Sequence, residues 1–447
     1  MLNRKAAQGI RRRSHILRSG FAVVVLAQWA IPARSAPLYT LTSGGDPAVI
    51  ELGRSLFNTE WLPAGIAGQS VPAASRTEGV GPLFNSASCA GCHDRGEGGP
   101  GPVGDGLVPI SLEIQLDSIA PASNGDPVYG HVFNTAATPG VRAEGRVTVR
   151  YGEIYGYYYP DGTRWRVRVP HYQFTGLSHG PLLGTTVIKP RIAPPLFGVG
   201  LLEMIPEQAI GNPTTDEGGA AAGVAAWHVR QGVRSLGRFG WQGDALSVRD
   251  QTTKAMAGEM GLTSVLQPRD DCTPAETECL GTSTGLSPEV SEERVDALVA
   301  FARSSVVPAP TPDDDEARFG YELFKSIGCA ACHRPRVPVT LVGGGAQPES
   351  AFIEPYTDLR LHNLGNRMSD ETVSGQKVTS LWRTPPLWGL AYRLESHVQM
   401  TYLHDGRARS AEEAILWHGG EAARSRRNFM NMGPRSRKAL LHWVESR

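Results

Sequence analysis

Two five-residue segments carry the residues with the most distinctive chemistry. They are Cys89-Ala-Gly-Cys92-His93 and Cys329-Ala-Ala-Cys332-His333. Two thiols one helical turn apart can both bond to one edge of a haem, and the adjacent histidine can then bind the iron. The pattern C-x-x-C-H is the signature of covalent c-type haem attachment. We therefore predict two covalently bound haem c groups, with His93 and His333 as proximal iron ligands.

Two other uses of these cysteines are a pair of thiol redox sites and one zinc site built from both pairs. A redox dithiol of the thioredoxin type follows a strand in a βαβ pattern, which surrounds neither copy, and it has no use for an adjacent histidine. The last two cysteines, Cys272 and Cys279, lie in a polar segment without a histidine neighbour. In an oxidising compartment they are expected to form a structural disulfide, with two free thiols as the alternative.

The first 35 residues indicate export. They contain seven Lys or Arg and no Asp or Glu, and a short apolar run from Phe21 to Ile31 precedes Ala33-Arg34-Ser35-Ala36. This arrangement is typical of a secretory signal peptide at 1–35, whereas a membrane anchor needs about 20 apolar residues. We expect a periplasmic protein with no membrane span after signal cleavage.

The rest of the composition limits the class of protein. Without the first 35 residues, 37 basic and 44 acidic side chains remain, a net charge of −7. A general polyanion binder is therefore excluded, and no nucleic-acid partner is expected. A length of 447 residues allows two or three domains, and 52 Gly and 33 Pro predict long loops.

Helices are expected around both motifs. Asp46-Pro47 and Thr311-Pro312 each resemble the capped start of a helix, and apolar residues recur at helical spacing from Phe319 to Ile327. Gly320 would allow a close crossing with a closing helix near Leu440. A further helix is expected from Ser287 to Phe301. We therefore predict a mainly α fold with two cytochrome c-like haem domains, at 36–303 and 304–447.

Residues 107–190 are expected to form a β-rich insertion in the first of these domains. Apolar and polar residues alternate from Arg146 to Val169 around an Asp161-Gly162 turn. Such alternation on both sides of a turn predicts antiparallel strands. The tyrosines of this stretch are expected to pack within the strands, with a contact surface as the alternative.

Beyond the two motifs, the chain resembles the di-haem oxidoreductases of the bacterial cytochrome c peroxidase and methylamine-utilisation group. It resembles more closely the branch of that group described as di-haem thiol oxidoreductase-like. The resemblance covers nearly the whole mature chain and rests on Gly81–His93, Arg191–Glu203, Tyr356–Leu359, Trp382–Gly389 and Tyr402–Arg407. It implies a C-terminal haem that takes electrons from a small redox protein, an N-terminal haem that reduces hydrogen peroxide, and a Ca²⁺ ion between the haems.

The resemblance also implies contacts to the haems. Arg191 and Arg383, in segments with Pro194 and Pro385, match positions at which the family's arginine meets the haem propionates. His418 matches the position of the distal ligand of the C-terminal haem, which implies bis-histidine ligation. The alternative ligand is His404. The N-terminal iron is expected to be open or bound to water.

The segment from Arg238 to Met260 is similar to the family segment on the distal side of the N-terminal haem. Trp241 is implied to lie between the haems and carry electrons. Gln251 is implied to hold peroxide through its amide, and Glu259 to move the peroxide proton. The step from Gln251 to Glu259 is two residues shorter than in the family, so Glu203 and Glu207 are the alternatives to Glu259.

Two other functions remain open at this point. One is an electron carrier with two six-coordinate irons and no peroxide chemistry. The other is an oxidase that acts on a protein or thiol substrate and uses the β-rich insertion as a docking surface.

Overall fold

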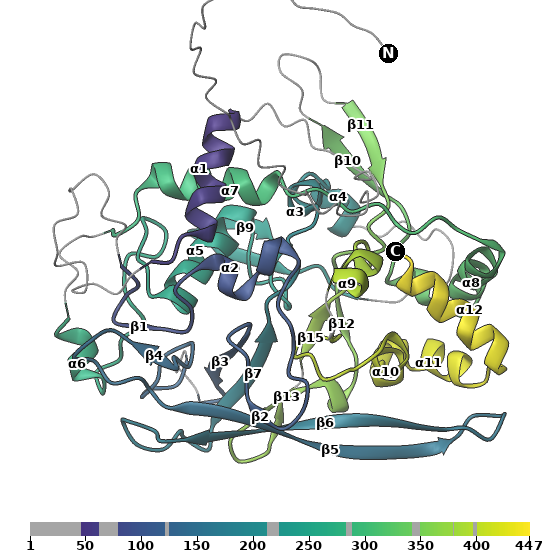
Figure 1. Ribbon diagram of the computed structural model, residues 1–447, viewed down its shortest axis with the longest axis horizontal. Coiled ribbons are helices and arrows are strands. Elements are labelled where there is room, and N and C mark those ends of the chain that lie inside the picture. The colour runs from purple at the N-terminus through teal and green to yellow at the C-terminus, as the bar shows by residue number, and fades with distance from the viewer. Residues whose placement is uncertain are drawn as a thin grey trace, which may run out of the picture. The chain divides into compact units, whose positions relative to one another are not determined.

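The computed structural model describes residues 46–61, 79–120, 125–211, 223–282, 288–341, 349–378, 380–396 and 400–447 (Figure 1). The predicted signal peptide at 1–35 lies outside these residues. Residues Ala36–Arg447 form one compact unit, and the predicted division of this unit at 303/304 stays a prediction. In the described part of the chain, no helix is both long enough and apolar enough to cross a membrane.

One pair of crossing helices stands next to the first motif. Helix α1 (Pro47–Asn58) begins where the sequence predicts, because the Asp46 carboxylate accepts a hydrogen bond from the Ala48 amide at 2.9 Å. It packs against α7 (Glu292–Arg303), which starts a turn later than expected. The crossing is close at Gly53, where an added Cβ would lie 1.9 Å from the Ala297 carbonyl oxygen.

A second pair of crossing helices stands next to the second motif. Helix α8 (Asp315–Ser326) packs against α12 (Pro434–Glu445). The expected cap at Thr311 is wrong, because the Asp314 carboxylate caps α8 by accepting a hydrogen bond from the Ala317 amide at 2.7 Å. Gly320 permits the crossing as predicted, since an added Cβ would lie 2.1 Å from the Ala439 carbonyl oxygen.

The longest strands form a hairpin that runs along one side of the molecule (Figure 1). Strand β5 (Arg146–Tyr158) pairs antiparallel with β6 (Arg164–Thr175) across the turn at Asp161-Gly162, as the alternation predicts. Strand β2 (Gly106–Leu107) extends this sheet beside β5.

A second sheet draws strands from widely separated parts of the chain. Its order is β14-β13-β7-β3, from Lys377–Val378, Asp370–Thr372, Thr186–Ile192 and Leu112–Ser118. Alternate residues of β3 and β7 point to opposite faces. Apolar side chains of one face, such as Ile114 and Ile188, enter a hydrophobic cluster, and Glu113 and Arg191 of the other face line a cavity.

The expected mainly α fold of two cytochrome c-like domains is wrong. The structure is 32% helix and 22% strand, the strands belong to several small sheets, and the described residues contain no clear cytochrome c-like helical domain. The remaining helices are α2 (Cys89–Cys92), α3 (Val199–Glu203), α4 (Glu207–Gly211), α5 (Val248–Met260), α6 (Thr277–Leu280), α9 (Leu390–Ser396), α10 (Ala411–Trp417) and α11 (Ala423–Met430). The remaining strands are β1 (Leu83–Phe84), β4 (Ala136–Ala137), β8 (Trp227–Arg230), β9 (Val233–Leu236), β10 (Val337–Leu341), β11 (Glu349–Ile353), β12 (Leu361–Asn363) and β15 (Leu381–Arg383).

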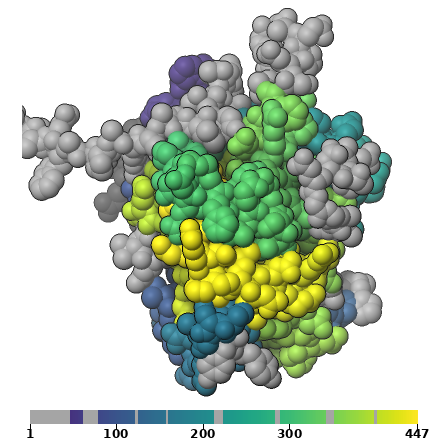
Figure 2. Space-filling view, turned by 90° about the vertical axis from the view of Figure 1, so that its right-hand side faces the viewer, coloured from purple at the N-terminus to yellow at the C-terminus, as the bar shows by residue number. Residues whose placement is uncertain are grey.

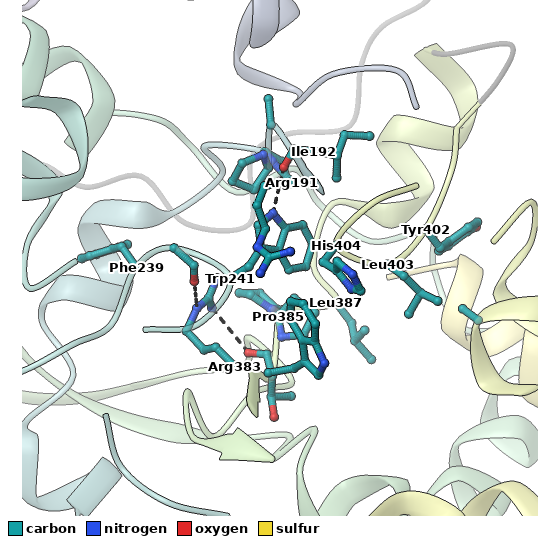
Figure 3. Close-up of a pocket in the computed structure, with 18 of the residues that line it drawn as sticks. Arg191, Ile192, Phe239, Trp241, Arg383, Pro385, Leu387, Tyr402, Leu403 and His404 are labelled. Atoms are coloured by element: carbon teal, nitrogen blue, oxygen red, sulfur yellow. Dashed lines mark hydrogen bonds between the residues drawn. The ribbon is translucent and has the colours of Figure 1, made fainter. Parts of the chain in front are cut away.

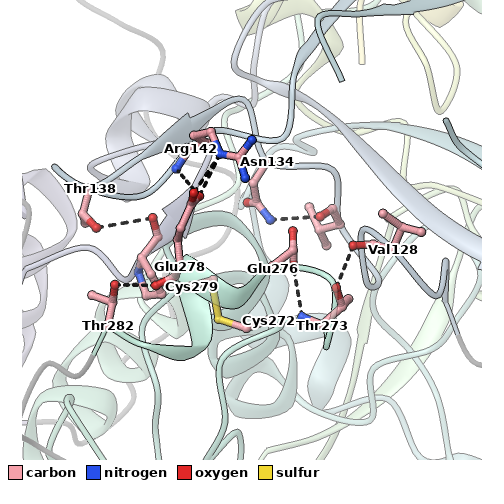
Figure 4. The surroundings of a disulfide bond; sticks show 12 residues. Val128, Asn134, Thr138, Arg142, Cys272, Thr273, Glu276, Glu278, Cys279 and Thr282 are labelled. Carbon is pink, nitrogen blue, oxygen red and sulfur yellow. Dashed lines mark hydrogen bonds and ion pairs between the residues drawn. A yellow bond between two sulfur atoms is a disulfide. The ribbon is translucent and has the colours of Figure 1, made fainter. Parts of the chain in front are cut away.

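The predicted disulfide between Cys272 and Cys279 is confirmed (Figure 4). It closes a loop that reaches across to the β-rich region. The Thr273 hydroxyl donates to the Val128 carbonyl at 2.7 Å, and Glu278 forms an ion pair with Arg142 at 2.9 Å. These contacts hold the segment before α7 against Val128 and Arg142, in the chain between β3 and β5.

Candidate functional site

Both C-x-x-C-H segments open into the same cavity. Its volume is about 940 Å³, and its walls include both cysteine pairs together with His93, His333 and His418. That volume is at the upper end of the range for ligand pockets, about 300–1,000 Å³. The cavity therefore offers a common space to prosthetic groups attached at the two motifs.

Three of the histidines that line the cavity are oriented alike. The Nδ1 atom of each lies 2.8 to 3.0 Å from a backbone carbonyl oxygen: Pro194 for His93, Tyr356 for His333 and Ala414 for His418. A carbonyl only accepts, so Nδ1 carries the proton and Nε2 keeps a free lone pair. This is the arrangement that orients metal-binding histidines.

Burial keeps these imidazoles neutral. Desolvation lowers the pKa of His93 to about 4 and that of His333 to about 4, and it also lowers the pKa of His418. A neutral imidazole is the form that binds a metal. At neutral pH all three side chains are therefore ready to act as ligands.

His418 lies opposite His333. Their ring centroids are 6.5 Å apart, which leaves room for one metal ion with a bond of about 2 Å to each imidazole. His404, the alternative ligand, also lines the cavity, but its ring stacks on Trp382 at a centroid distance of 3.7 Å and is not paired with His333. The geometry therefore pairs His333 with His418.

The four motif cysteines are free thiols in the structure. Burial raises the pKa of Cys89 and of Cys92 to about 11, and that of Cys329 to about 12. Reactive redox thiols have depressed pKa values. The two pairs therefore do not have the electrostatic environment of redox dithiols, and they fit the thioether attachment expected of haem c.

Both predicted arginines line the cavity. Arg191 is 4% exposed and forms two hydrogen bonds with Asp370, at 3.0 and 2.8 Å. Arg383 is 8% exposed and donates to the Gly240 carbonyl at 2.8 Å, but it forms no ion pair with a carboxylate of the described residues. Burial lowers the pKa of Arg383 to about 10. A buried guanidinium without a carboxylate partner fits an anionic group of a bound ligand.

Trp241 lies on the cavity wall between segments of both halves of the chain (Figure 3). Its indole N–H donates to the Ile192 carbonyl at 2.8 Å, which fixes the ring. The ring meets His404 edge to face at 6.5 Å, and His404 in turn stacks on Trp382. The structure thus places Trp241 in the cavity shared by the two motifs, in contact with other aromatic rings.

Gln251 and Glu259 lie on one face of α5 and line the cavity together with Met256. The end of α5 is fixed against the segment that leads to the first motif, since the amides of Asn85 and Ser86 donate to the Glu259 carbonyl at 2.7 and 3.1 Å. The eight-residue step therefore still brings both side chains to the same wall. The buried Glu259 Oε2 and Gln251 Oε1 atoms have no hydrogen-bond partner among the described residues.

The two alternative acids do not line the cavity in the described structure. Glu203 accepts a hydrogen bond from the Val248 amide at 2.9 Å and pairs with Arg303 at 2.6 Å. Glu207 is exposed. Glu259 is therefore the better placed acid.

Glu113 is a further residue of the site that was not predicted from the sequence. This residue of β3 lines the cavity and shares a hydrogen bond with Glu259. Burial raises the pKa of Glu259 well above its usual range, and the neighbouring Glu113 raises it further. The alternation in Leu112–Ser118 could have indicated a strand with one polar face, but the partner on α5 is 146 positions away and leaves no local signal.

A second missed cluster lies next to Cys332. The His362 ring contacts Asp358 at 3.0 Å, Glu421 at 2.9 Å and the Cys332 sulfur at 3.7 Å. Burial lowers the pKa of His362, but the hydrogen bonds to Asp358 and Cys332 outweigh it and raise the pKa to about 11. His362 is thus a buried cation beside the second motif.

The described residues hold one group of three potential metal ligands, Cys332, Asp358 and His362. Calcium takes six to eight oxygen ligands. This group does not have that composition, so the calcium site stays a prediction.

Comparison with known proteins identifies a family. The family described as "Di-haem oxidoreductase, putative peroxidase" matches residues 182–447. Among solved structures the chain is similar to "Kuenenia stuttgartiensis Hydrazine Synthase Pressurized with 20 bar Xenon", at 13% identity and a TM-score of 0.34, over 98% of this chain and 100% of that chain. No curated protein matches.

Proposed function

The chain belongs to the di-haem oxidoreductase family, and on that premise we propose that it is a periplasmic enzyme that reduces hydrogen peroxide. Electrons enter at the C-terminal haem, and peroxide reacts at the N-terminal haem. One observation carries this proposal: two cysteine pairs and three histidines with free Nε2 atoms line the same cavity.

The geometry supports two unequal haem sites. In this proposal, Cys89 and Cys92 hold one haem with His93 as its ligand, and Cys329 and Cys332 hold the other between His333 and His418. No histidine stands opposite His93 among the described ring pairs, as it does opposite His333. One six-coordinate iron suits electron transfer, and one open iron suits a reacting ligand.

The N-terminal haem would supply electrons to the O–O bond, and the chain's own residues would bind peroxide and move its proton. The Gln251 amide can hold peroxide, and the Glu259 carboxyl can accept a proton from one oxygen and return it to the other. Both have a buried oxygen without a partner in the described structure. Trp241 provides an indole for electron transfer between the two sites.

The surface near the second motif supports an acidic redox protein as the electron donor. Lys325, Arg424 and Arg426 line the mouth of the cavity, and Arg427 is exposed beside them. From 421 to 438 the chain has six basic residues and one acid, Glu421. Figure 2 shows this face, where the yellow C-terminal helices lie beside α8 in green. A basic patch on a protein of net negative charge selects an acidic partner.

Stopped-flow mixing tests the proposal. The part-reduced holoprotein is mixed with hydrogen peroxide while both haem spectra are recorded. We expect rapid oxidation of the haems, with about two electrons consumed per peroxide. A protein that does not react with peroxide but exchanges electrons with redox proteins would instead be an electron carrier.

A further inference from the structure

Two carboxyl groups from distant parts of the chain meet in the cavity beside the first motif. Glu259 comes from the last turn of α5, and Glu113 comes from β3, where it is the cross-strand partner of Arg191 on β7. Both line the cavity, and they share a hydrogen bond. A hydrogen bond between two carboxyl groups requires a proton on one of them.

Two neutral amides contact the pair but leave one oxygen unsatisfied: Gln115 Nε2 donates to Glu113 Oε1, and the Asn85 side chain bonds to Glu259. The buried Glu259 Oε2 atom receives no N–H or O–H donor from the described residues. Two ionised carboxylates in contact would repel each other in a site that is also desolvated. One shared proton removes the repulsion and leaves only one negative charge to be desolvated.

The basic side chains near the pair form ion pairs with other carboxylates. From β7, Lys189 lies 3.5 Å from Asp117, and Arg191 is bonded to Asp370 of β13. Asp244, before α5, lines the same cavity. From α2 the cavity receives the haem-attachment residues Cys89, Cys92 and His93. None of the described cations forms an ion pair with Glu113 or Glu259.

The chain contains a matched pair away from this cavity. Glu144 is 0% exposed, Glu276 is 1% exposed, and their side chains share a hydrogen bond. One oxygen of Glu144 accepts from the Asn134 amide, and one oxygen of Glu276 accepts from the Thr273 amide; Figure 4 shows Glu276 beside Thr273. The other oxygen of each has no donor among the described residues. Neither residue lines the cavity in the described structure, so this pair has the same chemistry without access to a substrate.

We propose that Glu113 and Glu259 hold one proton between them at neutral pH, and that Glu113 is a positioning residue that lets Glu259 act first as base and then as acid on peroxide. This inference rests on the proposed peroxidase function. When the shared proton moves to Glu113, Glu259 becomes a carboxylate that can accept a proton despite its burial. The pair resembles in principle other carboxyl dyads that keep one proton between two acids.

The proton and electron balance closes. One peroxide O–H bond would break as Glu259 takes the proton from one oxygen. Glu259 then passes this proton to the departing oxygen as the O–O bond breaks, and that oxygen leaves as water. The two electrons come from the haems, which the redox-protein donor has reduced, and two solvent protons complete the second water. The pair ends the step with the same single proton.

Infrared spectroscopy of the holoprotein tests the shared proton without turnover. The C=O band of a protonated carboxyl is followed against pH in the unmutated protein and in Glu113→Gln, with Glu259→Gln to assign the band. We expect the band of Glu259 in Glu113→Gln to titrate about one pH unit lower or more, because the neighbouring negative charge is gone. An unchanged midpoint would overturn the proposal. Glu144→Gln, with Glu276→Gln as a second control, should leave this titration unchanged.

The pH dependence of the peroxide reaction provides a second readout. If the pair works only with one proton, a plot of the reaction rate against pH is bell-shaped. The rate falls at low pH, where the pair holds two protons, and at high pH, where it holds none. In Glu113→Gln the fall at high pH should disappear, leaving a single rise through the pKa of Glu259. Retention of the bell would overturn the proposal. If the infrared result holds but the protein does not react with peroxide, the proposed function fails and the shared proton stands.

Discussion

The orientation of single histidine rings is the most informative feature at the residue scale. His93, His333 and His418 each give the Nδ1 proton to a backbone carbonyl, whereas His362 has both ring nitrogens against carboxylates. The first three can bind iron through Nε2, and His362 cannot without losing a partner. Ring orientation thus separates the ligand candidates from a structural histidine of the same cavity.

His418→Gly should remove the sixth ligand of the C-terminal haem. His418 is the imidazole that stands 6.5 Å from His333 across the space for the iron. We expect one low-spin ferric signal to become high-spin or water-bound in electronic absorption and magnetic spectra, with both haems still attached. His404→Gly is the control, since its ring stacks on Trp382. If His404→Gly loses the low-spin signal and His418→Gly keeps it, the assignment is wrong.

Glu259→Gln should slow the peroxide reaction and preserve the haem spectra. The amide keeps the shape of the side chain but cannot transfer a proton. General acid–base catalysis contributes about 10²–10⁴-fold, so we expect a loss of about two orders of magnitude or more in the stopped-flow rate. The matched control is Glu203→Gln, whose carboxylate pairs with Arg303 outside the cavity wall. Equal rates for Glu259→Gln and the unmutated protein would remove Glu259 from the mechanism.

Motifs in the sequence predicted most of these residues, because attachment chemistry fixes short spacings. Cys89, Cys92 and His93 must lie within five residues to serve one haem, so this short segment is enough to predict their roles. Glu113 could not be found in this way. Its partner, Glu259, lies on α5, 146 positions further along the chain, and no local pattern relates the two residues.

At the scale of elements, two pairs of crossing helices line the cavity, one pair next to each motif. Gly53 and Gly320 let α1 approach α7 and α8 approach α12 closely. The role of Gly320 could be predicted because it lies on the apolar face of a helix, where a residue without a side chain lets a second helix come close. The helix starts were less predictable, since several capping residues compete at Thr311–Asp315 and only packing decides between them.

Gly320→Ala should destabilise the protein. The added Cβ would lie 2.1 Å from the Ala439 carbonyl oxygen and 2.8 Å from the Trp443 Cβ, so α8 and α12 must separate. Overpacking of this kind lowers the free energy of unfolding by about 1–3 kcal/mol. Denaturant unfolding of the holoprotein measures the change. Gly104→Ala, where an added Cβ meets nothing within 4 Å, is the control. Equal losses in both variants would contradict a specific crossing.

The strands explain why the expected fold class was wrong. The long hairpin of β5 and β6 shows clear alternation, but strands such as β13 (Asp370–Thr372) and β14 (Lys377–Val378) are too short to show any period. They exist because β13 pairs with β7, from Thr186–Ile192, far earlier in the chain. Non-local pairing of this kind raises the strand content without leaving a pattern in the sequence.

At the scale of the whole molecule, charge is distributed unevenly. Residues 421–438 are strongly basic, although the chain beyond residue 35 has a net charge of −7. This basic surface adjoins the second motif, whose thiols and histidine open into the shared cavity. Electron entry at this end and peroxide chemistry at the other would keep the two reactions apart.

Electron transfer from an acidic redox protein should weaken with salt. Salt screens the electrostatic attraction between the basic patch and the acidic partner. The second-order rate constant should therefore fall by about tenfold between about 0.01 M and 0.15 M salt. Stopped-flow mixing with a reduced acidic cytochrome measures it. Arg424→Glu with Arg427→Glu should lower the rate at low salt, whereas Arg150→Glu on β5, also exposed, should not. A rate independent of salt and of both changes would place the donor elsewhere.

The division of labour between the two irons is the centre of this account, and an electron paramagnetic resonance spectrum of the fully ferric holoprotein tests it most directly. The spectrum counts high-spin and low-spin irons separately. We predict one low-spin signal, from the haem between His333 and His418, and one high-spin or water-bound signal, from the haem held by His93. Two low-spin signals of equal weight, each with two strong protein ligands, would contradict an open reactive iron and leave an electron carrier in its place.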